Sequence, residues 1–509
     1  MSYLTLNDIE NLVYNKENVA LSPEKRERVT KAFDFLKEFS KDKVIYGINT
    51  GFGPMAQYRV DDKNLQELQF NLVRSHANGM GESLTPDQTR AIMICRLNTL
   101  SLGYSGTHPT ILETLVEYIN KEIYPLIPSH GSVGASGDLV QLAHLALGLI
   151  GEGNCYYQGE IISVSEALKM ASVSKVDLQL RDGLSLINGT SCMSGVAALN
   201  LIQLSKLLHF TVLTSSIMNE LTASYNDSFS KELNEAKMHI GQRVVAERMR
   251  DILKNGNVLK NRNEHLFDSS RIEGQEYFSE KVQEYYSLRC VPQIIGPVYD
   301  AYLHARKVLE EEINSANDNP IVCADSQSVY HGGNFHGDYI AFEMDKVKIG
   351  VTKLGMLVER QINYLLNHRL NQKFPPFLNA GKLGFNFGLQ GMQFSAVSTA
   401  AENQSLSTSV YIHTIPNNGD NQDIVSMGTN AALQTQKVID NTFEILSVQM
   451  VAIAQAIDLD GSLENLSTES QELYRFIRKH IEFVKEDEPK FENLKNIKEA
   501  LITSKERLQ

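Results

Sequence analysis

A glycine-rich segment ahead of an apolar run carries the residues best suited to unusual chemistry. It reads GSVGASGD from residue 131 to residue 138, and an apolar stretch begins at Leu139. A phosphate-binding loop would need a lysine and a Ser or Thr after the glycines, and neither is present. A nucleophile elbow needs Gly-x-Ser-x-Gly, whereas Gly137 follows Ser136 directly. A glycine turn leading into a helix capped near Asp138 is an equally good interpretation of this segment alone.

Six other short segments combine glycine, asparagine, tyrosine or arginine in ways that suit a polar site built on turns. They are YGINTGFG at 46–53, LINGT at 186–190, QEYYSLRC at 283–290, SANDNP at 315–320, GGNFHG at 332–337 and NQDIVSMG at 421–428. In this order, together with Ala135-Ser136-Gly137, they resemble the motifs of the aromatic amino acid ammonia-lyase and aminomutase family. The resemblance covers most of the chain and is strongest to bacterial tyrosine ammonia-lyases.

The resemblance implies a built-in electrophile. In that family the backbone nitrogen of the glycine attacks the alanine carbonyl, two waters leave, and a 4-methylidene-imidazole-5-one (MIO) ring results. Ala135, Ser136 and Gly137 are therefore expected to form an MIO autocatalytically, with Asp138 assisting the cyclisation. Small residues suit such a compressed turn, and only serine gives the exocyclic methylene by dehydration.

The resemblance also assigns catalytic roles. Tyr46 is the general base for the β-proton, while Tyr286 and Asn188 lie beside the MIO, position the amine and relay protons. Arg289 clamps the substrate carboxylate, since a guanidinium fork matches two carboxylate oxygens. Phe335 forms an aromatic wall under the substrate. An ordinary phenol, with a pKa of about 10, is a poor base at neutral pH, so we expect a site that favours the phenolate or an alkaline optimum.

Two positions bear on the substrate, and they point in different directions. Ser75-His76 has the order typical of histidine ammonia-lyases, but Gln422 stands where those enzymes have a glutamate facing the imidazole. A neutral amide is a weaker partner for imidazole and suits a phenol or phenyl ring. His76 is able to bond a tyrosine hydroxyl, and Gly53 and Asn421 are expected to bind substrate with it.

We therefore predict elimination of ammonia from L-tyrosine to give 4-coumarate. A histidine ammonia-lyase that makes urocanate is the alternative, and a tyrosine 2,3-aminomutase is the third possibility. Two other classes remain distinguishable by experiment. A helix-bundle scaffold would lack the near-UV absorbance that borohydride removes from an MIO, and a serine hydrolase would react with fluorophosphonates at Ser136.

The sequence predicts that the elements positioning these residues are helices. Apolar residues recur at spacings of three and four from Met344 to Leu365, and the proline-free region 417–488 is apolar on more than one face. We predict an all-α protein with a loop-rich, MIO-bearing N-terminal domain over 1–200. A long-helix bundle with a helical tail is expected over 201–509. The resemblance implies the ammonia-lyase architecture, which is like that of fumarase and aspartase.

Composition limits the partners. The formal net charge of −13 and the lack of a basic run argue against nucleic acid and anionic membranes. No uninterrupted apolar stretch reaches about 18 residues and the N-terminus does not read as a signal peptide, so we expect a cytoplasmic protein. The five separated cysteines offer neither a zinc site nor a disulfide frame. His331 and His336 lack a third ligand at suitable spacing, and we expect no metal. The resemblance further implies a homotetramer with shared active sites.

Overall fold

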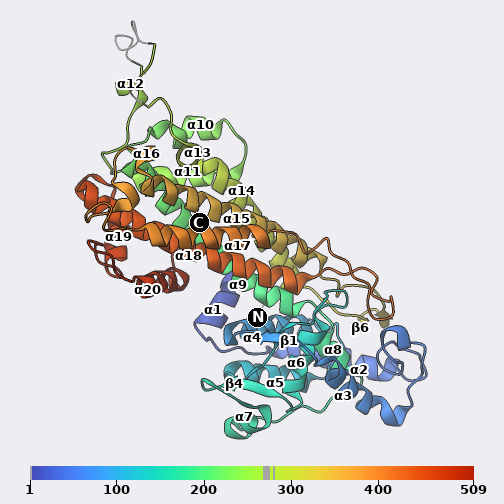
Figure 1. Ribbon diagram of the computed structural model, residues 1–509. Coiled ribbons are helices and arrows are strands. Elements are labelled where there is room, and N and C mark those ends of the chain that lie inside the picture. Colours follow the sequence, from blue (N-terminus) through green and yellow to red (C-terminus); the bar gives the residue numbers. More distant parts are fainter. Residues whose placement is uncertain (1–2, 268–275, 279–280, 509) are drawn as a thin grey trace. The chain divides into compact units, whose positions relative to one another are not determined.

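The computed structural model describes residues 3–267, 276–278 and 281–508, and most of these residues are helical (Figure 1). The prediction of a helical protein is confirmed. Short antiparallel strands of two to four residues accompany the helices.

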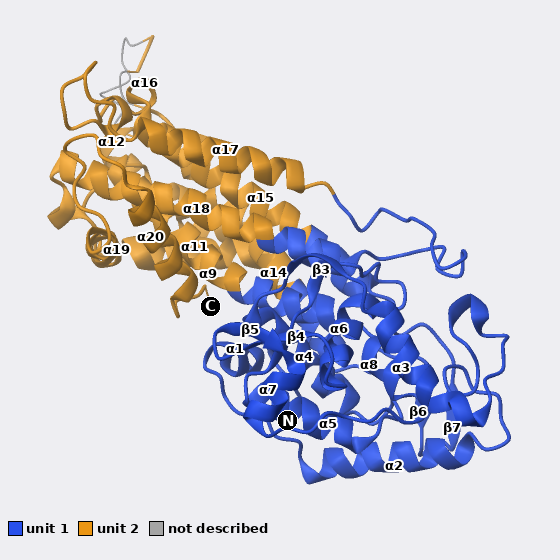
Figure 2. Ribbon diagram, turned by 60° about the horizontal axis from the view of Figure 1, so that its bottom comes forward, with its two compact units in different colours: residues 1–202, 305–345, 409–436 blue, residues 203–304, 346–408, 437–509 orange. Residues whose placement is uncertain are grey.

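The chain divides into two compact units, coloured separately in Figure 2. Unit 1 contains residues 1–202, 305–345 and 409–436, and unit 2 contains residues 203–304, 346–408 and 437–509. The sequence-based boundary at residue 200 lies next to the first of these boundaries. Two later segments also belong to unit 1, so both units are discontinuous in sequence.

Unit 1 combines helices with three small sheets, paired β1–β3, β2–β4–β5 and β6–β7. Its complete elements are α1 (Leu6–Tyr14), α2 (Pro23–Phe39), η1 (Gly53–Met55), η2 (Asp62–Asn64), α3 (Leu65–His76), β1 (Met80–Ser83), α4 (Pro86–Leu100), α5 (Pro109–Asn120), β2 (Tyr124–Pro125), β3 (Pro128–His130), α6 (Leu139–Leu149), β4 (Asn154–Tyr157), β5 (Glu160–Ser163), α7 (Val164–Ala171), α8 (Asp182–Ile187), β6 (Ile321–Cys323) and β7 (Ser328–Tyr330).

Unit 2 is helical in its described residues. Its complete elements are η3 (Asn226–Phe229), α10 (Lys231–Glu235), α11 (Ile240–Leu253), α12 (Arg262–His265), α13 (Tyr286–Arg289), α16 (His368–Asn371), η5 (Pro376–Leu378), α17 (Gln390–Leu406), η6 (Leu463–Asn465), α19 (Thr468–Arg478) and α20 (Phe491–Thr503). Four long helices contain unit boundaries: α9 (Ser191–Leu221), α14 (Val291–Ile313), α15 (Asp338–Leu366) and α18 (Gly428–Asp460).

The apolar periodicity from Met344 to Leu365, which predicted a helix, corresponds to the buried side of α15. Each of its periodic residues is at most 1% exposed: Met344, Val347, Val351, Leu354, Val358, Ile362 and Leu365. In unit 2, α15, α17 and α18 run side by side (Figures 1 and 2). Asn403 of α17 donates to Thr442 Oγ1 of α18 at 3.1 Å and accepts at its carbonyl from Thr352 of α15 at 3.4 Å. Buried polar pairs therefore fix the packing of this bundle.

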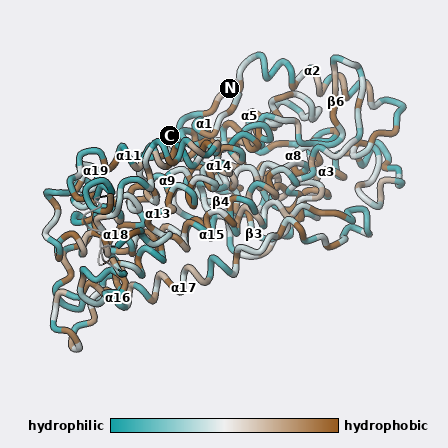
Figure 3. The backbone as a smooth tube through the Cα atoms, turned by 90° about the horizontal axis from the view of Figure 1, so that it is seen from above, coloured by the Kyte–Doolittle hydropathy of each residue, from teal (hydrophilic) through white to brown (hydrophobic). Residues whose placement is uncertain are grey.

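Hydrophobic segments recur along the long helices (Figure 3). By length and composition, α9 and α18 could each cross a membrane, but 94% and 83% of their most apolar windows are buried inside the protein. Their apolar character is that of helices in a protein core.

Helix α4 is fixed at its start by a capping box. The Thr85 hydroxyl accepts from the Gln88 N–H at 3.3 Å, and the Gln88 side chain accepts from the Thr85 N–H at 2.7 Å. Pro86 occupies the first turn, where its missing N–H costs no helical hydrogen bond. From Gln88 to Leu100 every residue of this helix is buried, so its side chains provide a fixed support for the turns packed on it.

Candidate active site

The Ala-Ser-Gly turn lies between β3 and α6, and its backbone is pressed against the Asn188-Gly189 turn. Gly137 has φ +70° and forms a parallel bridge with Gly189. A Cβ at Gly137 would overlap the Gly189 backbone, so only glycine fits. The Asp138 N–H donates to the Gly189 carbonyl at 2.8 Å. Ala135 is 4% exposed. The turn is therefore compressed and enclosed, as closure of a ring between Ala135 and Gly137 requires.

Asp138 occupies the N-cap position of α6, yet its carboxylate does not cap the helix. It accepts from Ser132 Oγ at 2.7 Å, Thr429 Oγ1 at 2.6 Å and the Met193 N–H at 2.8 Å. Burial raises the pKa of this carboxyl, and these hydrogen bonds oppose the rise. Asp138 is therefore the N-cap residue, as the sequence interpretation placed it, but its carboxylate accepts no N–H of the first turn of α6 and is instead hydrogen-bonded in the core behind the Ala-Ser-Gly turn.

Ser136 is contacted by two amide side chains. Asn188 Nδ2 donates to the Ser136 carbonyl at 3.1 Å, and Gln422 Nε2 donates to Ser136 Oγ at 2.8 Å. Asn188 is 4% exposed and Gln422 is 9% exposed, whereas the neighbouring Asn421 is exposed. Two motifs distant in sequence thus meet at the serine, and Asn421 lies at the surface beside them.

The tyrosine loop packs against the same late segment. Tyr46 is half-buried, its hydroxyl accepts from the Gly53 N–H at 3.0 Å, and its ring meets Phe52 edge-on at 6.2 Å. A Cβ at Gly53, which has φ +51°, would lie 2.7 Å from Asn418 Nδ2. The predicted residues Tyr46 and Gly53 therefore belong to the same part of unit 1 as the 417–422 loop.

His76 ends α3 with one ring nitrogen engaged. Its Nδ1 lies 2.9 Å from the Leu72 carbonyl and 3.0 Å from Ser75 Oγ, and we assign the ring proton to Nδ1 because a carbonyl oxygen only accepts. Nε2 has no hydrogen-bond partner among the described residues and is left as an acceptor. The turn beyond it is tied to α6, since the Gly79 N–H donates to His144 Nε2 at 3.0 Å.

Phe335 is half-buried in the segment between β7 and α15. That segment is joined to the turn, because the Gly337 N–H donates to the Gly134 carbonyl at 3.1 Å. Ser426 Oγ donates to the same carbonyl at 2.9 Å. The structure thus brings the Phe335 loop to the turn but gives its ring no aromatic contact within the described residues.

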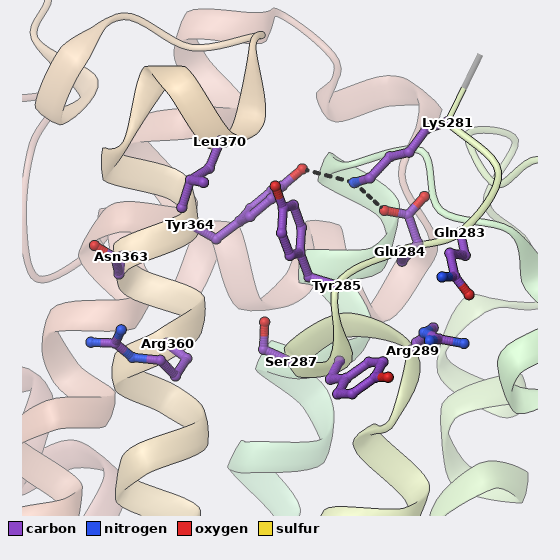
Figure 4. A pocket seen from close by; sticks show the side chains of 11 residues that line it. Lys281, Gln283, Glu284, Tyr285, Ser287, Arg289, Arg360, Asn363, Tyr364 and Leu370 are labelled. Carbon is purple, nitrogen blue, oxygen red and sulfur yellow. Dashed lines mark hydrogen bonds and ion pairs between the residues drawn. The ribbon is translucent and has the colours of Figure 1, made fainter. Parts of the chain in front are cut away.

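Tyr286 and Arg289 lie in unit 2, in a pocket of about 750 Å³ formed by residues 281–289 and α15 (Figure 4). The Arg289 guanidinium lies over the Tyr286 ring at 4.6 Å. Among the described residues Arg289 forms no ion pair, and its buried Nε has no hydrogen-bond partner. Lys281, in contrast, donates to Glu284 at 2.5 Å and to the Tyr364 hydroxyl at 3.4 Å. Arg289 is therefore a cation available for a carboxylate.

The chain matches the family model for aromatic amino acid lyases over residues 4–479. It belongs to the aromatic amino acid lyase family. It is 38% identical to a tyrosine ammonia-lyase from Cupriavidus metallidurans over 87% of this chain and 84% of the relative. It is 35% identical to a histidine ammonia-lyase from Geobacillus thermodenitrificans over 94% and 91% of the two chains. The crystal structure of a tyrosine aminomutase from Streptomyces globisporus is 35% identical, with a TM-score of 0.94 and coverage of 98% and 95%.

Membership of the aromatic amino acid lyase family has three consequences. The chain is a carbon–nitrogen lyase, the family acts on small aromatic amino acids, and the family depends on the MIO. Cyclisation requires a turn closed by small residues and a buried backbone, and the surroundings of Ser136 fit both requirements.

Metal ligation is not suggested by the described residues, in which no three His, Cys, Asp or Glu side chains form a group able to hold a metal ion. His336, considered as a ligand from the sequence, is hydrogen-bonded to the Asp338 carboxylate and lies 3.3 Å from the Ile424 carbonyl.

Residues that sequence reasoning missed surround the turn of this lyase. Thr429 and the Met193 N–H bind Asp138, and Ser426 binds Gly134. Ser426 lies inside a recognised motif and Thr429 directly follows it, so a closer look at hydroxyl residues near motifs would have found both. Nothing local signals Met193, whose contribution is a backbone N–H.

Proposed function

We propose that this lyase eliminates ammonia from L-tyrosine and releases 4-coumarate. The observation that carries the proposal is the neutral amide of Gln422, 2.8 Å from Ser136 Oγ, at the position where histidine ammonia-lyases have a carboxylate. A carboxylate would hold an imidazole N–H strongly, and an amide does so weakly. The acceptor at His76 Nε2 complements this, since it suits the O–H of a phenol.

The electrophile is proposed to form from Ala135, Ser136 and Gly137. The Gly137 nitrogen bonds to the Ala135 carbonyl carbon, and the carbonyl oxygen leaves as one water with the amide hydrogens of Gly137 and Ser136. The Ser136 hydroxyl leaves with the Ser136 α-hydrogen as the second water. The resulting MIO supplies the electrophile that makes the amino nitrogen a better leaving group. Asn188 holds the Ser136 carbonyl, and Asp138 holds the far side of the turn through its hydrogen bonds.

Proton removal is assigned to the Tyr46 hydroxyl. Its oxygen accepts from the Gly53 N–H at 3.0 Å, which fixes the position of the hydroxyl. General-base catalysis of this kind contributes about 10²–10⁴-fold. Tyr46 thus removes the β-proton while Gly53 keeps its oxygen in place.

Arg289 and Tyr286 are proposed to bind the carboxylate and amine ends of the substrate. The guanidinium of Arg289 stacks on Tyr286 and has no described counter-ion, so it retains the capacity to pair with a carboxylate in bidentate fashion. Phe335 is assigned to the face of the substrate ring, next to the loop that Gly337 ties to the turn.

We further propose a homotetramer in which different copies complete each site. Helix α17 supports this, because Ala396, Ala400 and Asn403 are its buried residues while Phe394 is 65% and Val397 45% exposed. Apolar side chains displayed along a helix are typical of a surface that another subunit covers.

Two alternatives have specific support. Ser75-His76 and the histidine ammonia-lyase relative favour L-histidine. The aminomutase structure favours a tyrosine 2,3-aminomutase, in which the same residues return ammonia to the product. The test supplies L-tyrosine, L-phenylalanine and L-histidine separately and follows 4-coumarate, cinnamate and urocanate by absorbance, with β-tyrosine measured by chromatography. Fastest formation of urocanate, or accumulation of β-tyrosine ahead of 4-coumarate, would overturn the assignment.

A further inference from the structure

A fully buried arginine stands behind the Asn188-Gly189 turn. Arg96, on α4, is 0% exposed, and its Nη2 donates to the Asn188 carbonyl at 2.9 Å and to the Ser185 carbonyl. Desolvation lowers its pKa to about 10, which leaves the guanidinium charged at neutral pH. A fixed cation is thus directed at two carbonyl oxygens of one short segment.

These carbonyls need a partner because α8 ends here. The last carbonyls of a helix accept no hydrogen bond from within the helix, and the negative end of the helix dipole favours a nearby cation. Ser185 and Asn188 lie at the end of α8, and Arg96 reaches both. The bonds fix the direction in which the chain leaves the helix and enters Gly189.

The segment that Arg96 holds is the one that holds the cyclising turn. Asn188 Nδ2 donates to the Ser136 carbonyl at 3.1 Å, and the Gly189 carbonyl accepts from the Asp138 N–H at 2.8 Å. Gly189 also has no room for a side chain, because a Cβ there would meet Arg96 Nη1. Contacts therefore continue from the guanidinium through residues 188–189 to the backbone of Ser136 and Gly137.

Burying Arg96 at this helix end costs folding free energy. Its Nε and Nη1 are buried without a hydrogen-bond partner among the described residues. Buried donors left unpaired reduce stability, and an apolar residue of similar size often serves a core as well or better. Stability alone therefore gives a poor account of an arginine at this position.

We propose that Arg96 is a positioning residue for MIO formation: it holds Asn188-Gly189 so that the Gly137 nitrogen faces the Ala135 carbonyl. The inference rests on the proposed function, since it assumes that residues 135–137 cyclise with loss of two waters. Its readout is the mass of the chain, which does not depend on substrate or turnover.

The same helix supplies a matched control. Arg90 is 1% exposed, and its guanidinium donates to the carbonyls of Leu12, Glu17 and Ile119 at 2.6 to 2.9 Å. Like Arg96 it is a buried arginine of α4 bonded to backbone carbonyls, but none of its bonds goes to residues 185–189. Arg90→Met therefore reproduces the loss of a buried cation without disturbing the turn.

The test measures the intact mass of the unaltered chain, Arg96→Met and Arg90→Met after equal expression times, with thermal melting of each. We expect the two-water deficit in the unaltered chain and in Arg90→Met, and about a tenfold smaller dehydrated fraction in Arg96→Met. If Arg96→Met does not fold, Arg96→Lys, which keeps the charge but loses the guanidinium fork, is judged by the same criterion.

Full dehydration of a folded Arg96 variant would overturn the inference, as would an equal loss in Arg90→Met. Absence of the deficit from the unaltered chain would instead overturn the proposed function. The two failures are therefore distinguishable in one set of spectra.

Discussion

Replacing His76 with phenylalanine tests how the proposed substrate site distinguishes a phenol from a phenyl ring. In the structure Nδ1 of His76 donates to the Leu72 carbonyl at 2.9 Å, which fixes the ring and leaves Nε2 as the acceptor. A bound L-tyrosine is expected to donate its hydroxyl to that nitrogen. L-phenylalanine would leave the nitrogen buried and unpaired. Phenylalanine at position 76 removes the acceptor and puts an apolar ring in its place.

The size of the effect follows from the single available nitrogen. One neutral hydrogen bond, together with the penalty for an unpaired acceptor, is worth about 1–3 kcal/mol, or about 5–150-fold in kcat/KM. His76→Phe should therefore reduce the preference for L-tyrosine over L-phenylalanine by a factor in this range. The kcat/KM for L-tyrosine falls because its hydrogen bond to the imidazole is lost. The kcat/KM for L-phenylalanine rises because its binding no longer leaves an imidazole nitrogen unpaired.

The assay compares 4-coumarate and cinnamate formation at equal enzyme concentrations for both chains. Ser75→Ala is the control, since the Ser75 hydroxyl lies 3.0 Å from Nδ1, on the side of the ring away from Nε2. It should keep the preference nearly unchanged. A His76→Phe enzyme that retains its preference within about twofold would refute the reasoning, because a lost hydrogen bond of this kind has a larger effect.

Four other outcomes are expected. Ser136→Ala should fold normally, keep its full encoded mass and lose activity by several orders of magnitude, as judged by intact mass and product absorbance. Tyr46→Phe should keep the two-water deficit but lose about 10²–10⁴ in kcat, and a smaller loss would assign the base elsewhere. Gln422→Glu should raise kcat/KM for L-histidine about tenfold by providing a charged acceptor, measured as urocanate. Light scattering at assay concentration should give four times 57.0 kDa, and an active monomer would contradict shared sites.

The helices could be predicted from local patterns, and the chemistry of the turn from the resemblance of seven motifs to a known family. The spacing from Met344 to Leu365 specifies one apolar side, and α15 buries it. The periodicity depends on residues close together in sequence, so a pattern within one segment carries it. Ring closure at 135–137 was expected from the resemblance and not from this segment alone; the structure adds that Gly137 lies against Gly189 with no space for a Cβ.

The contacts between segments could not be predicted in this way. Gln422 and Ser136 are 286 residues apart, and only the tertiary fold determines that the amide of one reaches the hydroxyl of the other. The same holds for Arg96, which appears in the sequence as one more arginine in an apolar helix. Asp138 was expected near a helix cap and occupies the N-cap position, but its carboxylate also accepts from Thr429, which is 291 residues away. In each case a partner distant in sequence determines the contact.

The bond from Gln422 to Ser136 Oγ joins an amide to the hydroxyl that the proposed ring closure would remove. If Ser136 loses its hydroxyl as proposed, Gln422 meets two successive environments within the lifetime of one molecule. In the newly folded chain its amide holds the leaving oxygen, and afterwards the same N–H is released to face whatever enters the pocket. A substitution at this position then alters the yield of mature protein and the choice of amino acid separately. Specificity measured only on purified, matured enzyme would miss the first effect, whereas the fraction of chains that mature would record it.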